Sequence, residues 1–204
     1  QQSGIAHDPA AVRVDRLEEA IGVVRAVMTG QPVVHEGTHY RLDGFVGHPT
    51  THQPGGPPII VGGGGRRVLS IAARHADIVG INPNLRAGVV GPDAARDALP
   101  DAVDQKVAWV REAAGDRFDD IELNVLAFVA ALTDDRTGMA ADLAEVFGTP
   151  AEEIVEAPAV LVGTVDEIGE AIERRRDRWG FSYYVLQAGV AEQMAPVVER
   201  FTGR

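Results

Sequence analysis

A run of four glycines between two apolar segments is the part of this chain that most clearly suggests a ligand-binding site. Residues 57–82 predict a strand, a turn made only of glycine (Gly62–Gly65), a helix and a second strand. Glycine leaves room for a sharp turn and exposes backbone N–H groups at the positive end of the following helix. With Arg66 and Arg67 beside it, the turn predicts a binding site for the phosphate of a nucleotide-like cofactor.

Two observations limit this interpretation of the turn. Four glycines can form a tight loop without a ligand, and Arg66 and Arg67 can be solvated residues of a first helical turn. The spacing also differs from the Gly-x-Gly-x-x-Gly of dinucleotide-binding folds, and Asn82 rather than an acidic residue ends the second strand. A nicotinamide-binding domain of that type is therefore disfavoured.

Polar residues at strand ends and in one loop are further candidates. Asn82 and Gln187 each end a predicted strand, where the functional side chains of parallel barrels lie. Four histidines form two pairs with four-residue spacing: His35, His39, His48 and His52. They fall in a hairpin and a proline–glycine loop rather than on one helix face, so we predict no metal site. We expect His48 and Gln187 to contact substrate, and no residue is assigned a catalytic role.

The elements that must position these residues alternate along the chain. We expect helices over about 9–29, 66–76, 93–114, 138–147, 165–179 and 193–202, a hairpin and extended loop over 31–56, and core strands over 59–61, 77–82, 121–132 and 181–187. Asp8 is the expected N-cap of the first helix, and Thr149 and Thr164 each begin a capping-box pattern.

Strands that alternate with helices require a parallel sheet, either doubly wound or closed as a barrel. Four core strands are too few for the eightfold barrel, and the chain opens on a helix. The sequence therefore predicts a single domain over 1–204 that is the C-terminal part of a (β/α)8 barrel, with the 31–56 segment as an insertion and the first strands missing.

Composition excludes several classes of function. The net charge of −11 and the pI near 4.9 disfavour non-specific binding to nucleic acid or anionic membranes. Cysteine is absent, which excludes disulfides, thiolate metal sites and cysteine catalysis. No segment has 18 consecutive apolar residues, and the polar start is unlike a signal peptide. We therefore expect a soluble, cytoplasmic protein.

Five strings of residues together resemble the luciferase-like monooxygenase superfamily, and within it the branch of flavin- and deazaflavin-dependent oxidoreductases built on the eightfold barrel. The strings are Arg13–Ala20, Glu36–Tyr40, Pro57–Gly65, Ala72–Asp77 and Leu161–Thr164. They occur in order, and the resemblance runs from about Gly4 to Arg204. The chain departs from the family in one respect, because it lacks the first four strands that family members carry before the segment matching Gly4.

The resemblance implies a flavin-type cofactor across the carboxyl-terminal mouth of the barrel, with its phosphate held by backbone amides. The cofactor-binding residues expected here are Gly62, Gly63, Gly64, Gly65, Arg66, Ile81 and Asn82. The pattern is most like the group that uses the deazaflavin coenzyme F420, with FMN as the alternative cofactor. The expected function is an oxidoreductase that passes a hydride between F420 and a small organic substrate held under the 31–56 loop.

Three other functions remain open. An FMN-dependent monooxygenase would use the same turn, because both cofactors present a phosphate. A non-catalytic flavin-binding or interaction protein would follow if 204 residues were the whole gene product, since half a barrel leaves sheet edges unpaired and needs a partner such as a second copy. We therefore expect a homo-oligomer, a dimer. A barrel enzyme that handles phosphosugars would bind its substrate's phosphate at the same turn.

Overall fold

The computed structural model describes residues 7–85, 88–89 and 91–202, so the two limits of the family resemblance, Gly4 and Arg204, lie outside the described part. In chain order the elements are α1 (Ala10–Met28), β1 (Val33–Glu36), β2 (Arg41–Phe45), β3 (Ile60–Gly63), α2 (Arg66–His75), β4 (Ile78–Ile81), α3 (Pro92–Arg96), α4 (Pro100–Ala114), β5 (Glu122–Leu126), β6 (Val129–Leu132), α5 (Arg136–Phe147), α6 (Ala151–Ile154), β7 (Val160–Gly163), α7 (Val165–Trp179), β8 (Phe181–Val185) and α8 (Ala195–Phe201).

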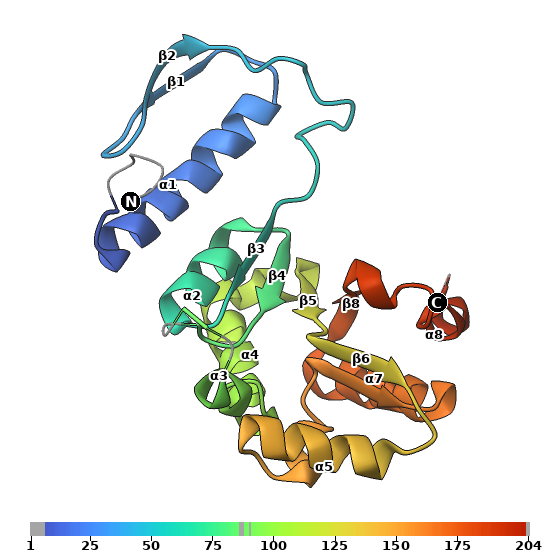
Figure 1. The fold of residues 1–204 in the computed structure, drawn as a ribbon. Coiled ribbons are helices and arrows are strands. Elements are labelled where there is room, and N and C mark those ends of the chain that lie inside the picture. Colours follow the sequence, from blue (N-terminus) through green and yellow to red (C-terminus); the bar gives the residue numbers. More distant parts are fainter. Residues whose placement is uncertain (1–6, 86–87, 90, 203–204) are drawn as a thin grey trace.

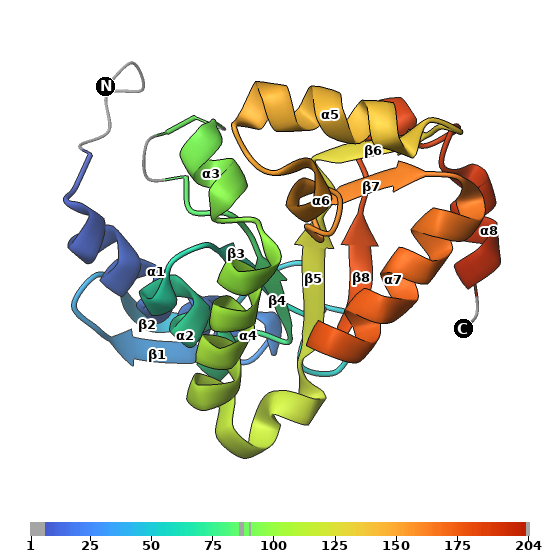
Figure 2. The same ribbon diagram turned by 90° about the horizontal axis from the view of Figure 1, so that it is seen from below.

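A four-stranded parallel sheet in the order β3-β4-β5-β8 forms the centre of the molecule. Helices α2, α4 and α7 cover one face of it (Figures 1 and 2). The opposite face carries the exposed side chains of Ile60 and Tyr183. Strands β6 and β7 form a separate parallel pair, and β1 and β2 form an antiparallel hairpin. The α/β class with a parallel sheet is therefore confirmed, and its four strands fit a partial barrel.

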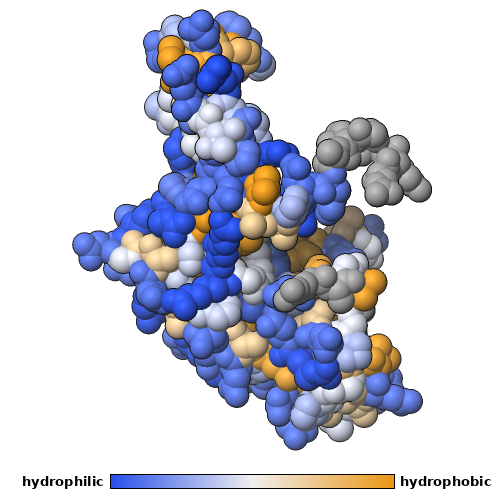
Figure 3. Space-filling model, turned by 90° about the vertical axis from the view of Figure 1, so that its left-hand side faces the viewer, coloured by the Kyte–Doolittle hydropathy of each residue, from blue (hydrophilic) through white to orange (hydrophobic). Residues whose placement is uncertain are grey.

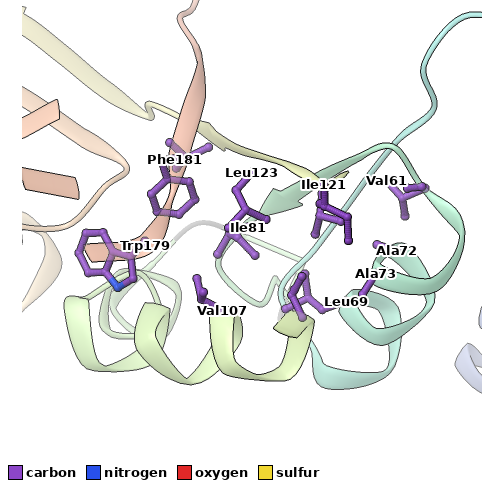
Figure 4. Close-up of a cluster of buried hydrophobic side chains, with 14 of the residues drawn as sticks. Val61, Leu69, Ala72, Ala73, Ile81, Val107, Ile121, Leu123, Trp179 and Phe181 are labelled. Carbon is purple, nitrogen blue, oxygen red and sulfur yellow. The ribbon is translucent and has the colours of Figure 1, made fainter. Parts of the chain in front are cut away.

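The main core lies between the sheet and the covering helices (Figure 4). Leu69, Ala72 and Ala73 of α2 are completely buried and form the inner face of this helix. The two alanines let α2 approach the sheet closely, while Val107 of α4 and Trp179 of α7 fill the space further along. This packing fixes the start of α2 relative to the ends of β3 and β4.

The predicted strand over 121–132 is wrong, because the structure divides it into β5 and β6. The N–H of Ala127 donates to the carbonyl of Val185 at the end of β8, whereas the N–H of Val129 donates to the carbonyl of Ala159 just before β7. The backbone thus changes its partner strand within two residues. Strand β7, which the sequence reading missed, supplies the new partner; it is short and buried throughout, so no alternation marks it.

Three helix starts in the structure differ from the predicted ones. The helix expected over 93–114 is two helices, because Pro100 begins a new one after Arg96. Pro9, not Asp8, is the N-cap of α1, and the Asp8 carboxylate instead pairs with Arg16 at 2.6 Å. The N-cap of α6 is Pro150, so the capping box predicted at Thr149 is absent.

The capping box predicted at Thr164 is confirmed in both of its bonds. The N–H of Glu167 donates to the Thr164 hydroxyl at 3.3 Å, and the N–H of Thr164 donates to the Glu167 carboxylate at 2.8 Å. These bonds satisfy backbone donors that would otherwise lack partners at the start of α7.

One carboxylate attaches the β1–β2 hairpin to α1. The side chain of Glu19 accepts hydrogen bonds from the N–H groups of His39 and Tyr40 at 2.9 and 2.8 Å, and lies 3.0 Å from His35 Nε2. Gly37 makes room for it, because a Cβ there would lie 1.9 Å from Glu19 Oε1. Burial acts to raise the pKa of Glu19, but these hydrogen bonds lower it to about 2.

The hairpin projects beside α1, away from the central sheet (Figure 1). Figure 3 shows hydrophilic and hydrophobic residues intermixed over the projecting part of the molecule, and the exposed Val34 and Phe45 belong to the hairpin. Among the described residues, no helix is long and apolar enough to cross a membrane. The cytoplasmic location stays a prediction.

Replacing Glu19 with glutamine should change how stability depends on pH. The carboxylate of Glu19 stabilises the fold above its ordinary pKa of 4.5, and this contribution is lost as the pH falls through about 2. The melting temperature of Glu19→Gln should therefore lie below that of the wild type at pH 7, and the difference should shrink between pH 4.5 and 2.

The exposed Glu36 of the same hairpin gives a matched control, since its pair with Arg41 is long, at 3.7 Å. Glu36→Gln should melt with the wild type at every pH. A difference between wild type and Glu19→Gln that stays constant down to pH 2 would contradict the assignment.

Candidate functional site

The glycine run joins β3 to α2, as predicted, but the turn is shorter than expected. Gly62 and Gly63 belong to β3 and pair with β4, so only Gly64 and Gly65 lie between the strand and the helix. The glycines with positive φ all lie elsewhere in the chain, so a left-handed backbone is not what requires glycine here. Close approach requires it: a Cβ on Gly64 would lie 2.5 Å from the Asn84 nitrogen, and one on Gly62 would lie 2.7 Å from Asn82 Nδ2. The turn is therefore packed against the backbone that follows β4.

The start of α2 is open to a ligand. Its N-cap is Gly65, in an extended conformation, and no side chain caps the helix. The first N–H groups of a helix have no acceptor within it and carry the positive end of the helix dipole. A Cβ on Gly65 would meet only Asn84 Nδ2, at 3.9 Å, so the approach to these N–H groups is not filled. This geometry suits an anionic group such as a phosphate.

The two arginines next to the turn point to other helices. The Arg66 guanidinium donates to both carboxylate oxygens of Glu112 on α4, at 2.9 and 3.1 Å, and both side chains are exposed. Arg67 pairs with Asp15 on α1. At the turn, Arg66 therefore presents its backbone N–H rather than its guanidinium.

Two predicted residues at the end of β4 take different positions. The N–H of Asn82 donates to the carbonyl of Gly63 at 3.0 Å, and its side chain lies over Gly62. The structure therefore brings Asn82 together with the turn. Ile81 is buried in the core beneath the helices, so only its backbone is near the turn.

The two residues expected to contact substrate lie apart from each other. Gln187 follows β8 and donates weakly to the carbonyl of Phe128, at 3.4 Å, between β5 and β6. It is at the same edge of the sheet as Asn82, two strand spacings or about 10 Å away.

His48 lies elsewhere, in a segment that packs on the end of α1. A Cβ on Gly47 would lie 2.6 Å from Val27 Cγ1, and the Thr51 hydroxyl donates to the carbonyl of Met28 at 2.9 Å. This segment precedes the start of β3, whereas the glycine turn follows its end. The expectation that the 31–56 loop covers the cofactor is corrected accordingly, because a helix-to-strand connection lies at the opposite edge of a parallel sheet.

Asn124 is a candidate that the sequence reading missed. Its side chain is 5% exposed and donates to the carbonyl of Tyr183 at 3.0 Å. It lies in register with Gly80, which in turn pairs with Gly62. A Cβ on Gly80 would lie 3.4 Å from Asn124 Oδ1 and 3.7 Å from Asn82 Nδ2, so two amides flank the same glycine. An amide inside the apolar run 121–132 was the available signal.

Within residues 7–85, 88–89 and 91–202, the side chains that commonly bind metal ions form no group of three or more that could hold one. His35 instead contacts Glu19, and the four histidines do not converge.

Gly64 and Gly65 should respond differently to the same substitution. Gly64→Ala forces the Asn84 backbone to move, and we expect it to lower the free energy of unfolding by about 1–3 kcal/mol. Gly65→Ala meets nothing closer than 3.9 Å and should cost less than about 1 kcal/mol. Denaturant unfolding of the two variants checks this, and equal stabilities would contradict the close approach at Gly64.

Comparisons with known proteins agree with this fold. Solved structures with a similar fold include the coenzyme F420-dependent tetrahydromethanopterin reductase from Methanopyrus kandleri (TM-score 0.63, 16% identity, 91% of this chain and 61% of that one). A second is the EDTA monooxygenase from Chelativorans sp. BNC1 (TM-score 0.64, 13% identity, 98% of this chain and 61% of that one). A third is a riboflavin lyase solved with modified FMN and its substrate riboflavin (TM-score 0.65, 13% identity, 98% of this chain and 60% of that one).

At these identities the likeness shows the fold alone, and the chain spans about 60% of the length of these proteins. A search of curated proteins found no match. Residues 2–183 match the family model described as luciferase-like monooxygenase, which covers most of the chain and all of the sheet except the last two residues of β8. The chain therefore belongs to the luciferase-like monooxygenase family.

Proposed function

We propose that this chain is part of an oxidoreductase that binds the phosphate of a flavin-type cofactor at Gly62–Gly65 and passes a hydride between coenzyme F420 and a small organic substrate. The observation that carries the proposal is the uncapped start of α2, which opens at the carboxyl end of β3. Ligands of parallel α/β folds bind at this edge.

The backbone supplies the phosphate contacts. The N–H groups of Gly65 and Arg66 lie at the positive end of α2, and an anionic phosphate group there would satisfy donors that no side chain caps. The local field outweighs the net charge of −11, because charges beyond about 10 Å are screened by salt.

Amide side chains extend the site from the turn along the sheet. Asn82 and Asn124 flank Gly80, whose missing side chain lets the Gly62 backbone and both amides lie close together. These amides are the proposed hydrogen-bonding partners of the part of the cofactor next to its phosphate. Gln187 lies at the same edge and is the proposed substrate contact. His48 has no part in this proposal.

The cofactor supplies the redox step, and the chain positions it. F420 carries a hydride and activates oxygen poorly, because carbon replaces N5 of the flavin ring, whereas FMN supports oxygen chemistry. An FMN-dependent monooxygenase is the second candidate. It is supported by the fold shared with a protein named as EDTA monooxygenase and with one solved with modified FMN. The predicted dimer stays a prediction.

A substitution at the N-cap separates cofactor binding from folding. Gly65→Asp would cap α2 with its own carboxylate and place a negative charge where the phosphate is proposed to bind. We expect this variant to be about 1 kcal/mol more stable than Gly65→Ala, yet to bind F420 and FMN at least tenfold more weakly. Denaturant unfolding and fluorescence titration measure the two effects.

Gly65→Ala is the matched control, since it changes the same position without adding charge. Equal affinities of the two variants for both cofactors would place the phosphate elsewhere and overturn the proposal. Binding of F420 but not FMN would favour the hydride-transfer enzyme, and the reverse would favour the monooxygenase.

A further inference from the structure

An ion pair between a buried lysine and a half-buried aspartate lies behind the backbone that follows β4. Lys106 of α4 is 1% exposed, and the side chain of its partner Asp97 is 34% exposed. The Lys106 ammonium group lies 2.6 Å from the carboxylate of Asp97, the residue that follows α3, and also contacts the Asp97 carbonyl. A cavity of about 10 Å³ beside the pair is lined by Asn82 and Pro83, which places the pair directly against the strand end.

Stability alone gives a weak reason for this pair. Burial lowers the pKa of Lys106, and Asp97 only partly offsets the effect, so holding the ammonium group charged here is unfavourable without its partner. The cost of removing the lysine from water offsets much of its attraction to the half-buried carboxylate, so the pair is weak evidence for stability. The pair therefore calls for an explanation in terms of what it positions.

The Asp97 carboxylate has a second partner, and that partner leads to the turn. The same oxygen that faces Lys106 accepts a hydrogen bond from the backbone N–H of Asn84, at 2.6 Å. The Asn84 nitrogen and the Pro83 carbonyl carbon are the atoms that a Cβ on Gly64 would meet at 2.5 Å. A continuous series of contacts therefore runs from Lys106 through Asp97 and Asn84 to Gly64.

We infer that Asp97 and Lys106 are positioning residues of the phosphate site: the ammonium group fixes the carboxylate, the carboxylate fixes the Asn84 backbone, and that backbone fixes the glycine turn. The inference rests on the proposed function, because it assigns the phosphate to this turn. Hydrogen-bond donors bind a phosphate well only when they are already aimed at it, so a small shift of the turn weakens binding without any direct contact being lost.

The test compares ligands that differ only in the part that carries the phosphate. The double variant Asp97→Ala/Lys106→Met removes both charges at once, so neither is left buried without its partner. Fluorescence titrations use FMN against riboflavin, and F420 against the phosphate-free 8-hydroxy-5-deazariboflavin. Compared with the wild type, the double variant should bind whichever phosphate-bearing cofactor the protein uses, FMN or F420, about tenfold more weakly. Its affinity for the corresponding phosphate-free compound should be unchanged.

A second ion pair on α4 provides the matched control. The Asp104 carboxylate accepts hydrogen bonds from the Arg178 guanidinium at 2.6 Å and from the Trp179 ring N–H at 2.6 Å. Both partners belong to the end of α7 rather than to the glycine turn. Asp104→Asn should lower the melting temperature and leave the ratio of the two affinities unchanged. Hydrogen exchange without ligand adds an independent readout: the amide of Asn84 should exchange faster in the double variant and at the wild-type rate in Asp104→Asn.

The outcomes distinguish the two proposals. If the wild type prefers the phosphate-bearing ligand and the double variant keeps the same preference, the positioning role is overturned and the proposed function stands. If the wild type shows no such preference, or binds none of the four ligands, the phosphate site itself fails and this inference fails with it. Unchanged exchange at Asn84 in the double variant would also overturn the positioning role.

Discussion

Two backbone segments lie too close together at the carboxyl ends of β3 and β4 to admit side chains, and the site depends on this contact. A Cβ on Gly64 would overlap the Asn84 backbone, and one on Gly62 would overlap the Asn82 amide. Because these positions are glycine, the start of α2 and the loop after β4 share one edge of the sheet. In the proposed function, donors from the turn and amides from the neighbouring strands would face the same ligand.

Most of the strings that identify the family hold the fold together rather than form the site. Within Arg13–Ala20, Asp15 pairs with Arg67, Glu18 contacts Arg74 and His75, and Glu19 binds the hairpin. Asp77 accepts from the Ile59 N–H at 2.8 Å and from Arg25 at 2.9 Å, and so joins the start of β3 to α1. Four of the five strings thus contact one another through carboxylates. The string that ends in Gly62–Gly65 also lies at the proposed site.

Local signals predicted much of the fold, and long-range pairing explains what they missed. The capping box at Thr164 and the helix after the glycine run depend on neighbouring residues, so they could be predicted. The division of 121–132 could not, because a change of partner strand leaves hydropathy unaltered. The partner of Arg66 is Glu112, 46 residues away, and no sequence spacing reveals it. The position of Asn124 beside Gly80 depends on how β4, β5 and β8 are aligned, and the sequence does not reveal this alignment.

The most direct test of the central claim is an amide NMR titration of the intact chain with FMN and, separately, with riboflavin. F420 and its phosphate-free form can be used in the same way. If the start of α2 receives the phosphate, the amides of Gly65, Arg66 and Arg67 should shift with the phosphate-bearing ligand and stay in place with the other. Shifts at these amides with neither ligand, accompanied by large shifts elsewhere in the chain, would contradict the account.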